Sequence, residues 1–239
     1  MKLKKAIKYH LYEYKKAFII FYCIIISVLA IVAVLKNFTV LKEYSDSFTV
    51  GGLELATMIF LFVTGLNSFK SEFKYMLQNG ISRKTTSISF TISTSVVAVM
   101  AVIDIIIAEI IPFIGIEYSS MMYQLFGGIS KNFGVLYYVK SFLFLTTSYA
   151  LVFMVGHIIS LLYYRMNTIG KVIVSVLGFF ALNISINISI FNSLGLVEIA
   201  EKILVFFSNP LTLSALNITI FLILSFVSYL GTKNAKIKA

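Results

Sequence analysis

The chain has 239 residues, of which 59% are hydrophobic and only 13% are charged, and its mean hydropathy is +0.95. Soluble domains carry about 25% charged residues, and a water-soluble fold of this length could not bury so much apolar surface. These values exclude an ordinary soluble protein and predict a single all-α membrane domain over residues 1–239. The net charge of +10 would suggest a nucleic-acid partner in a soluble protein, but the positions of the basic residues argue against one.

Residues 1–16, MKLKKAIKYHLYEYKK, combine lysines with apolar residues at helical spacing. As a helix, this segment places Leu3, Ile7, Leu11 and Tyr14 on one side and most of the lysines elsewhere. The pattern is typical of a helix that lies in the membrane interface. A basic tail that only follows the positive-inside rule is the alternative.

Six segments are apolar and long enough to cross a bilayer, whose hydrocarbon core needs about 20 helical residues. They are residues 17–35, 53–69, 87–111, 141–164, 172–191 and 211–231. The first follows a basic start, as in a signal peptide, but its apolar run is long enough to span, so we expect it to be retained. The predicted six-helix membrane domain is thus 17–231, with a cytoplasmic tail at 232–239.

The flanks of these segments predict the orientation of the chain. Fifteen of the 20 lysines and arginines lie in the N-terminal segment, the second and fourth connections and the C-terminal tail. The positive-inside rule therefore places both termini and the second connection in the cytoplasm. Lysine is far commoner than arginine, and Ile, Phe and Asn are abundant, which suggests a low-GC bacterium and its plasma membrane.

The second connection, FKSEFKYMLQNGISRK at residues 69–84, predicts a short cytoplasmic helix. Its apolar residues recur at positions i, i+4, i+7 and i+8, which places them on one helical face: Phe69, Phe73, Met76 and Leu77. Gly80 can adopt the left-handed conformation that ends a helix, and Ser82 can cap the next one. A generic basic loop is the alternative.

Residues 192–210, before the last span, predict an amphipathic or re-entrant helix at the outer surface. Apolar residues recur there at helical spacing, and Asn209 and Pro210 end the segment. A helix that only packs on the bundle is an equally good interpretation.

The order of these features resembles the permease subunit of ABC-2-type transporters. The second connection carries the pattern E-x(4)-L-x-x-G-I-S-R at Glu72, Leu77, Gly80, Ile81, Ser82 and Arg83. The resemblance implies that this helix couples the permease to a separate cytosolic ATPase subunit, which binds ATP and Mg, and that two identical or related permease chains form the pathway. The coupling residues it implies are Phe69, Glu72, Phe73, Met76, Leu77, Gly80 and Arg83, with Phe73, Met76, Leu77 and Arg83 facing the ATPase.

The chain has no phosphate-binding loop of the form GxxxxGK[ST], so we expect no cofactor and no enzymatic activity in this subunit. Members of the family that the chain resembles move varied cargo, and the short outer loops argue against permeases that pass cargo to outer partners through a folded domain. The resemblance to small six-span permeases of low-GC bacteria implies export of a hydrophobic or amphipathic substrate, such as an antimicrobial-type peptide. Two other functions stay open. One is an ion-driven secondary transporter, and the other is a membrane scaffold or immunity protein that transports nothing.

Several polar residues fall within the predicted spans. Counting from Lys84, about 20 residues reach the outer surface near Asp104, which favours an interfacial position over a role in a translocation path. A polar strip in the fifth span either packs against helices or lines the path: Asn183, Ser185, Asn187 and Ser189. His10 and His157 are expected to lie far apart, so no metal site is expected, and His157 is interpreted as a packing residue.

Overall fold

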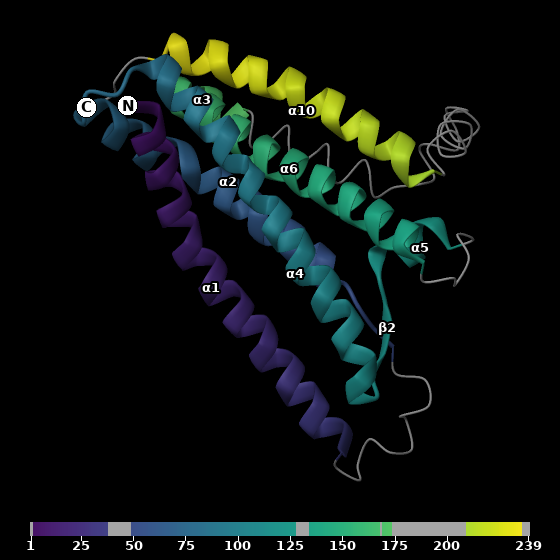
Figure 1. The fold of residues 1–239 in the computed structure, drawn as a ribbon. Coiled ribbons are helices and arrows are strands. Elements are labelled where there is room, and N and C mark those ends of the chain that lie inside the picture. The colour runs from purple at the N-terminus through teal and green to yellow at the C-terminus, as the bar shows by residue number, and fades with distance from the viewer. Residues whose placement is uncertain (1, 38–48, 128–133, 168, 174–208, 236–239) are drawn as a thin grey trace.

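The computed structural model describes residues 2–37, 49–127, 134–167, 169–173 and 209–235 (Figure 1). The predicted fifth span and outer helix lie almost entirely outside these ranges. The polar strip lies wholly outside them: Asn183, Ser185, Asn187 and Ser189.

Five helical runs among the described residues are long and apolar enough to cross a bilayer. They are α1 (Lys2–Asn37), α2 (Leu53–Gln78), the run of α3 (Arg83–Ser93), η2 (Thr94–Val96) and α4 (Val97–Ile110), α6 (Val135–Arg165) and α10 (Pro210–Lys233). Shorter elements are β1 (Thr49–Gly51), η3 (Ile111–Ile114), β2 (Glu117–Ser119) and α5 (Met121–Phe126). These five helices confirm the prediction of an all-α membrane protein, whereas the sixth span stays a prediction.

α1 and the α3–α4 run are parallel to each other. His10 and Tyr22 of α1 contact Ser89 of α3 and Asp104 of α4, respectively, so residue numbers rise together along both helices. α2 runs the opposite way, because its Glu72 contacts Tyr14 and its Phe60 stacks on Phe21 further along α1.

α6 and α10 are also parallel to each other. Asn217 of α10 donates a hydrogen bond to Ser148 of α6, and a Cβ added at Gly231 would touch Leu161. α6 therefore ends near the described chain termini, whereas α10 begins at the opposite end of the bundle (Figure 1).

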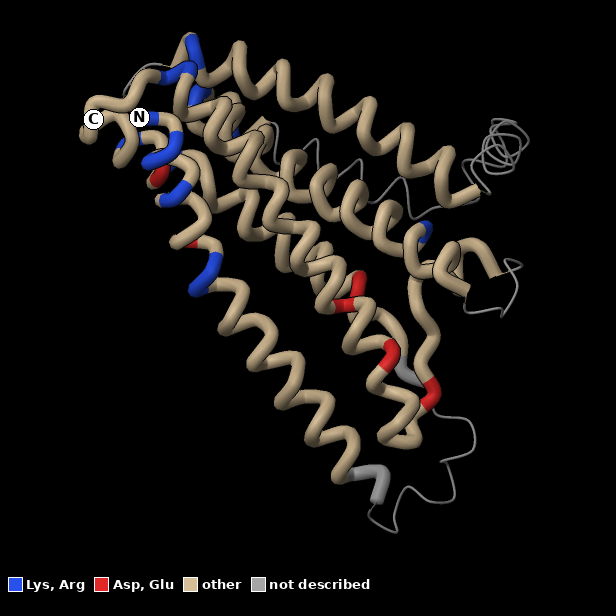
Figure 2. Tube along the Cα trace, in the orientation of Figure 1, with Lys and Arg blue, Asp and Glu red and all other residues tan. Residues whose placement is uncertain are grey.

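Basic residues gather at the end of the bundle that holds both described termini and the α2–α3 turn, which we call the basic end (Figure 2). Residues Lys2, Lys4, Lys5 and Lys8 of α1 lie at this end, together with Arg83 and Lys84 at the start of α3. This distribution is the one that the positive-inside rule associates with the cytoplasmic side.

α1 is one helix of 36 residues, so the predicted separate interfacial helix at 1–16 is not found. No glycine or proline separates the basic segment from the apolar one, and nothing ends the helix there. At 1.5 Å per residue the helix is about 54 Å long, which exceeds a hydrocarbon core of about 30 Å. Of the residues predicted to share the apolar face of this segment, Tyr14 is buried in the bundle, whereas Leu3 and Leu11 are exposed on the surface of the protein.

The buried face of α1 instead repeats every four residues. It comprises Ala6, His10, Tyr14, Phe18 and Tyr22. These residues pack against α2, α3, α4 and α6, and they hold the first half of α1 to the bundle.

The predicted short helix between the second and third spans is the last part of α2. The polar side chains at residues 67–68 do not interrupt the helix, because Asn67 and Ser68 donate hydrogen bonds to the carbonyls of Val63 and Gly65 one turn earlier. Separate helices were predicted, but the structure shows one helix that continues to Gln78.

The end of α2 follows the prediction closely. Gly80 has a φ of 67°, its N–H donates to the Leu77 carbonyl, and the Ile81 N–H donates to the Met76 carbonyl. This pair of bonds is the Schellman motif. The Ser82 hydroxyl then accepts a hydrogen bond from the Thr85 N–H and caps α3. Only four residues therefore separate two membrane-length helical runs.

The third helical run has a 3₁₀ step at η2, between α3 and α4. Hydroxyl side chains at the start of the step donate hydrogen bonds to carbonyls of the preceding turn, as Ser93 does to Ser89 and Thr94 to Phe90. Such bonds compete with the helical ladder and often bend helices, which accounts for the step.

The backbones of α2 and α6 approach each other closely at two glycines. A Cβ at Gly65 would lie 2.3 Å from the carbonyl oxygen of Phe153, and one at Gly156 would lie 2.4 Å from that of Phe62. Glycine is required at both positions because any side chain would separate the two backbones.

Candidate functional site

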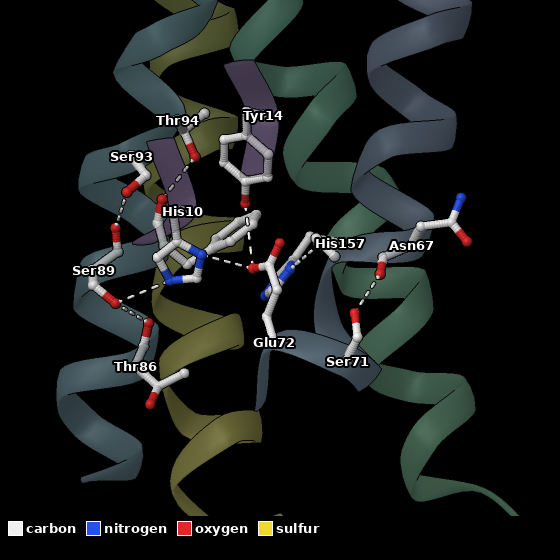
Figure 3. A network of polar contacts seen from close by, with 12 residues as sticks. His10, Tyr14, Asn67, Ser71, Glu72, Thr86, Ser89, Ser93, Thr94 and His157 are labelled. Atoms are coloured by element: carbon white, nitrogen blue, oxygen red, sulfur yellow. Dashed lines mark hydrogen bonds and ion pairs between the residues drawn. The ribbon is translucent and has the colours of Figure 1, made fainter. Parts of the chain in front are cut away.

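A group of buried polar side chains lies near the basic end, and we call it the inner cluster. It comprises His10 and Tyr14 of α1, Ser68 and Glu72 of α2, Ser89 of α3 and His157 of α6 (Figure 3). Four helices thus supply polar groups to one small volume of the bundle interior.

Glu72 is the centre of the inner cluster. Its Oε2 atom lies 2.7 Å from Nδ1 of His10 and accepts a hydrogen bond of 3.4 Å from the Tyr14 hydroxyl. Nε2 of His10 lies 3.1 Å from Oγ of Ser89, whose own hydroxyl donates to the Thr86 carbonyl. The imidazole of His10 is therefore held at both nitrogens between α2 and α3.

His157 lies on the other side of the same cluster. Its Nδ1 is 2.8 Å from Oγ of Ser68, and its ring stacks on Phe90 at a centroid distance of 3.6 Å. The expectation that His10 and His157 lie far apart is wrong, since both line one cavity. The packing role expected for His157 agrees with its ring contacts, although Ser68 adds a polar partner.

The cavity enclosed by these side chains has a volume of about 10 Å³, which is room for no more than one water molecule. A substrate cannot enter it in this conformation. Among the described residues, no three His, Cys, Asp or Glu side chains gather closely enough to hold a metal ion. The inner cluster can therefore connect four helices and relay a proton between imidazole, carboxylate and hydroxyl groups, but it cannot hold cargo.

The burial of α2 overturns part of the predicted coupling surface. Phe69, Phe73, Met76 and Glu72 are buried inside the bundle, where they cannot face another protein. Their apolar face packs on this chain's own helices, as when Phe69 and Phe73 contact Tyr164 of α6. In a membrane protein an apolar stripe at the cytoplasmic end of a span can belong to the core just as well as to a docking surface.

The remaining predicted coupling residues lie at or next to the α2–α3 turn. Gly80 is exposed, whereas Leu77 and Arg83 are half-buried. The start of α1 lies against this turn, because Lys2 donates a hydrogen bond of 2.9 Å to the Gly80 carbonyl and Tyr9 stacks on Tyr75. The turn is thus fixed to three helices.

A second buried carboxyl group, Asp104, lies further along the bundle. Its two oxygens accept hydrogen bonds from Tyr22 of α1 at 2.8 Å and from Tyr149 of α6 at 2.5 Å. The interfacial depth favoured by residue counting stays a prediction, but the side chain is fully buried between helices. Counting gives depth along a helix but not the face on which a residue lies.

Glu54 forms a third polar contact, at the start of α2. Its carboxylate accepts hydrogen bonds from the Tyr118 hydroxyl at 2.5 Å and from the Met121 N–H at 3.3 Å. Burial, together with the nearby charge of Glu54, raises the pKa of the Tyr118 phenol, so this hydroxyl stays a donor. The contact joins α2 to β2 and α5 at the end opposite the basic end.

Sequence reasoning missed His10, Tyr22, Glu54 and Tyr149 as members of polar sites. The four-residue repeat along α1 is the one signal in the sequence that could have indicated His10 and Tyr22, since it marks the face that the bundle buries.

Comparison of the chain with protein-family models, with curated proteins and with solved structures found no match.

Proposed function

We propose that this chain is the membrane-spanning permease subunit of an ATP-driven transporter in a bacterial plasma membrane. In this proposal the basic end is cytoplasmic, a separate cytosolic subunit binds ATP and Mg, and a second permease chain completes the pathway. The cargo is a hydrophobic or amphipathic molecule that is exported, and an antimicrobial-type peptide is one such class. The proposal rests on the resemblance of the second connection to the ABC-2 pattern and on the geometry of the α2–α3 turn.

The turn is the observation that carries the proposal. It is a four-residue link between two long helical runs, closed by the hydrogen bonds of Gly80 and Ile81 and capped by Ser82. A short link with fixed hydrogen bonds transmits a displacement to both helices instead of absorbing it in a loop. We therefore assign the ATPase contact to exposed residues in the turn and directly after it, Asn79, Gly80 and Lys84, and not to the buried Phe73 or Met76.

The test is purification of the tagged chain from its native membrane in mild detergent, with identification of the proteins that accompany it. The double variant Asn79→Asp, Lys84→Glu changes the exposed surface of the turn, and Lys140→Glu on α6 is the matched charge reversal away from it. We expect a stoichiometric ATPase with the wild type and the control, and its loss with the turn variant. Recovery of the same ATPase with the turn variant, or its absence from the wild type, would refute the proposal.

An ion-driven secondary transporter is the second candidate, because ionisable residues are buried within the membrane-length helices. The Glu72–His10 pair and Asp104 are placed where proton-coupled transporters carry such groups. Transport by the chain alone in ATP-free vesicles under a pH gradient, abolished by Asp104→Asn, would favour this candidate. A scaffold or immunity protein would transport in neither assay.

A further inference from the structure

A groove opens beside the contact between α2 and α6, near the basic end. Its volume is about 750 Å³, well within the range of small-molecule sites in proteins. It is lined by Leu66, Asn67, Lys70, Ser71, Lys74, Ser160, Tyr163, Tyr164 and Lys171. Among the described residues that line the groove, none is acidic, and Lys70 and Lys74 give its α2 side a positive charge.

The α2 wall of the groove is one helical face. Asn67, Lys70, Ser71 and Lys74 follow the spacing i, i+3, i+4 and i+7, on the side of α2 away from the inner cluster. Figure 3 shows Asn67 and Ser71 pointing away from His10 and Glu72. The same helix thus buries its phenylalanine face in the bundle and presents its lysine face to the groove.

The charge of this wall is not neutralised within the described part of the chain. Neither Lys70 nor Lys74 has an ion-pair partner there, and the one nearby carboxylate on α2, Glu72, is turned inward to His10. Two ammonium groups four residues apart repel each other, and an anion between them would remove that repulsion. The groove therefore favours an anionic ligand.

The lysine face continues as an apolar stripe toward the middle of α2. Val63 and Ile59 lie four and eight residues before Asn67 on the same side of the helix, and both are exposed. A hydrocarbon core that starts near Leu53 and takes about 20 residues ends near residue 72, so the lysines lie at the interface. Tyr163, on the α6 wall, is of the residue type that is enriched at this depth.

We propose that this groove binds an anionic membrane phospholipid, with its phosphodiester between Lys70 and Lys74 and an acyl chain along Val63 and Ile59. An apolar stripe that ends in a basic pocket matches a molecule with an acyl chain and a charged headgroup. Basic pockets between helices on the cytoplasmic side are where such headgroups bind. The site does not depend on the transporter role, and it lies apart from the exposed residues of the turn.

The experiment measures binding of phosphatidylglycerol to the delipidated full-length chain in neutral detergent, by native mass spectrometry. The variant Lys70→Gln, Lys74→Gln removes both charges of the α2 wall. Lys4→Gln, Lys8→Gln is the control, because these lysines are also exposed, four residues apart and at the basic end. Lys70→Arg, Lys74→Arg keeps the charge and checks that the wall tolerates substitution.

We expect the glutamine variant to bind phosphatidylglycerol at least about tenfold more weakly, since each lysine near an anionic headgroup contributes about a factor of five. The control pair and the arginine variant should bind like the wild type, and phosphatidylcholine should not compete. Equal losses in the two glutamine variants would show a general surface effect and overturn the proposal. Displacement by inorganic phosphate at an equal concentration would assign the groove to a soluble anion and overturn it as well.

Discussion

Glu72 of α2 and His10 of α1 lie 2.7 Å apart in the bundle interior, where their side chains are almost fully buried. The contact joins the basic half of α1 to the helix that leads into the α2–α3 turn. The Tyr14 hydroxyl and Ser89 extend it to four side chains on three helices. A movement of the turn therefore cannot leave α1 in place without breaking these contacts.

Removal of the Glu72 carboxylate should destabilise the protein strongly. Glu72→Ala leaves His10 and Tyr14 buried without their shared partner, and loss of one member of a buried pair costs about 3–5 kcal/mol. Glu72→Gln should cost less, because the amide oxygen can still accept from Tyr14. Thermal unfolding in detergent measures the effect, with Glu13→Ala on the exposed side of α1 as the control. Equal melting temperatures for Glu72→Ala and the control would show that the pair contributes nothing.

Because Tyr22 and Tyr149 both donate hydrogen bonds to Asp104, the loss of stability on substituting either tyrosine should depend on whether Asp104 is present. Tyr22→Phe and Tyr149→Phe each remove one hydrogen bond to a buried carboxyl group, which should cost about 1–3 kcal/mol. After Asp104→Leu, both tyrosine changes should cost much less, because the acceptor is already gone. Unfolding measurements on the double-mutant cycle check this, with the exposed Tyr12→Phe as the control. Purely additive effects would contradict the observed bonding.

Alanine at Gly65 or Gly156 should separate α2 from α6. The added methyl group would meet a backbone carbonyl at 2.3 or 2.4 Å, and backbone cannot move aside as a side chain can. We expect either substitution to lower the free energy of unfolding by roughly 1–3 kcal/mol or more. Gly134→Ala, at a φ of −83° that alanine adopts readily, is the control. Cross-linking between cysteines introduced on the facing sides of the two helices would report their separation, and unchanged yields in Gly156→Ala would refute the close contact.

The left-handed backbone conformation of Gly80 in the α2–α3 turn should limit which residues position 80 tolerates. Gly80→Val forces a β-branched residue into the left-handed region, whereas Gly80→Asn places there one of the few other residues that tolerate it. A Cβ at this position meets nothing closer than Lys2 Nζ at 4.0 Å, so the comparison is not dominated by a clash at the Cβ atom. The free energy of unfolding, measured in detergent, should be about 1–2 kcal/mol lower for Gly80→Val than for Gly80→Asn. Equal stability of the two variants would contradict the left-handed turn.

Much of the helical layout could be predicted from the sequence, because hydropathy and turn residues act locally. Gly80 and Ser82 occupy the roles expected of them, and the five described membrane-length helices fall on predicted spans. The inward faces could not be predicted in the same way. Phe73 is 1% exposed and Ile59 is 58% exposed, yet both are apolar, since lipid accepts an apolar side chain as readily as a protein core does.

The polar sites could not be predicted from the sequence for a different reason. His10 and Ser89 are 79 positions apart in the sequence, and only the parallel arrangement of α1 and α3 brings them together. No local pattern encodes such a pairing. The predicted coupling face was wrong at Phe73 and Met76, because amphipathic spacing was interpreted as a cytoplasmic docking surface, whereas the helix continues from the membrane span and buries these two residues in its own bundle.

The parallel packing of α10 on α6 has a consequence for biogenesis. A chain inserted from its N-terminus has α1, α2, the α3–α4 run and α6 in the bilayer before α10 is synthesised. Until α10 arrives, Leu161 lacks its contact with Gly231, and Phe69 and Phe73 lack the cover of Ala235. Thr232 of α10 also lines the cavity beside His10 and His157. The buried histidine region is therefore completed only when α10 has packed on α6, so a chain stalled before α10 would carry its two histidines on an unfinished bundle.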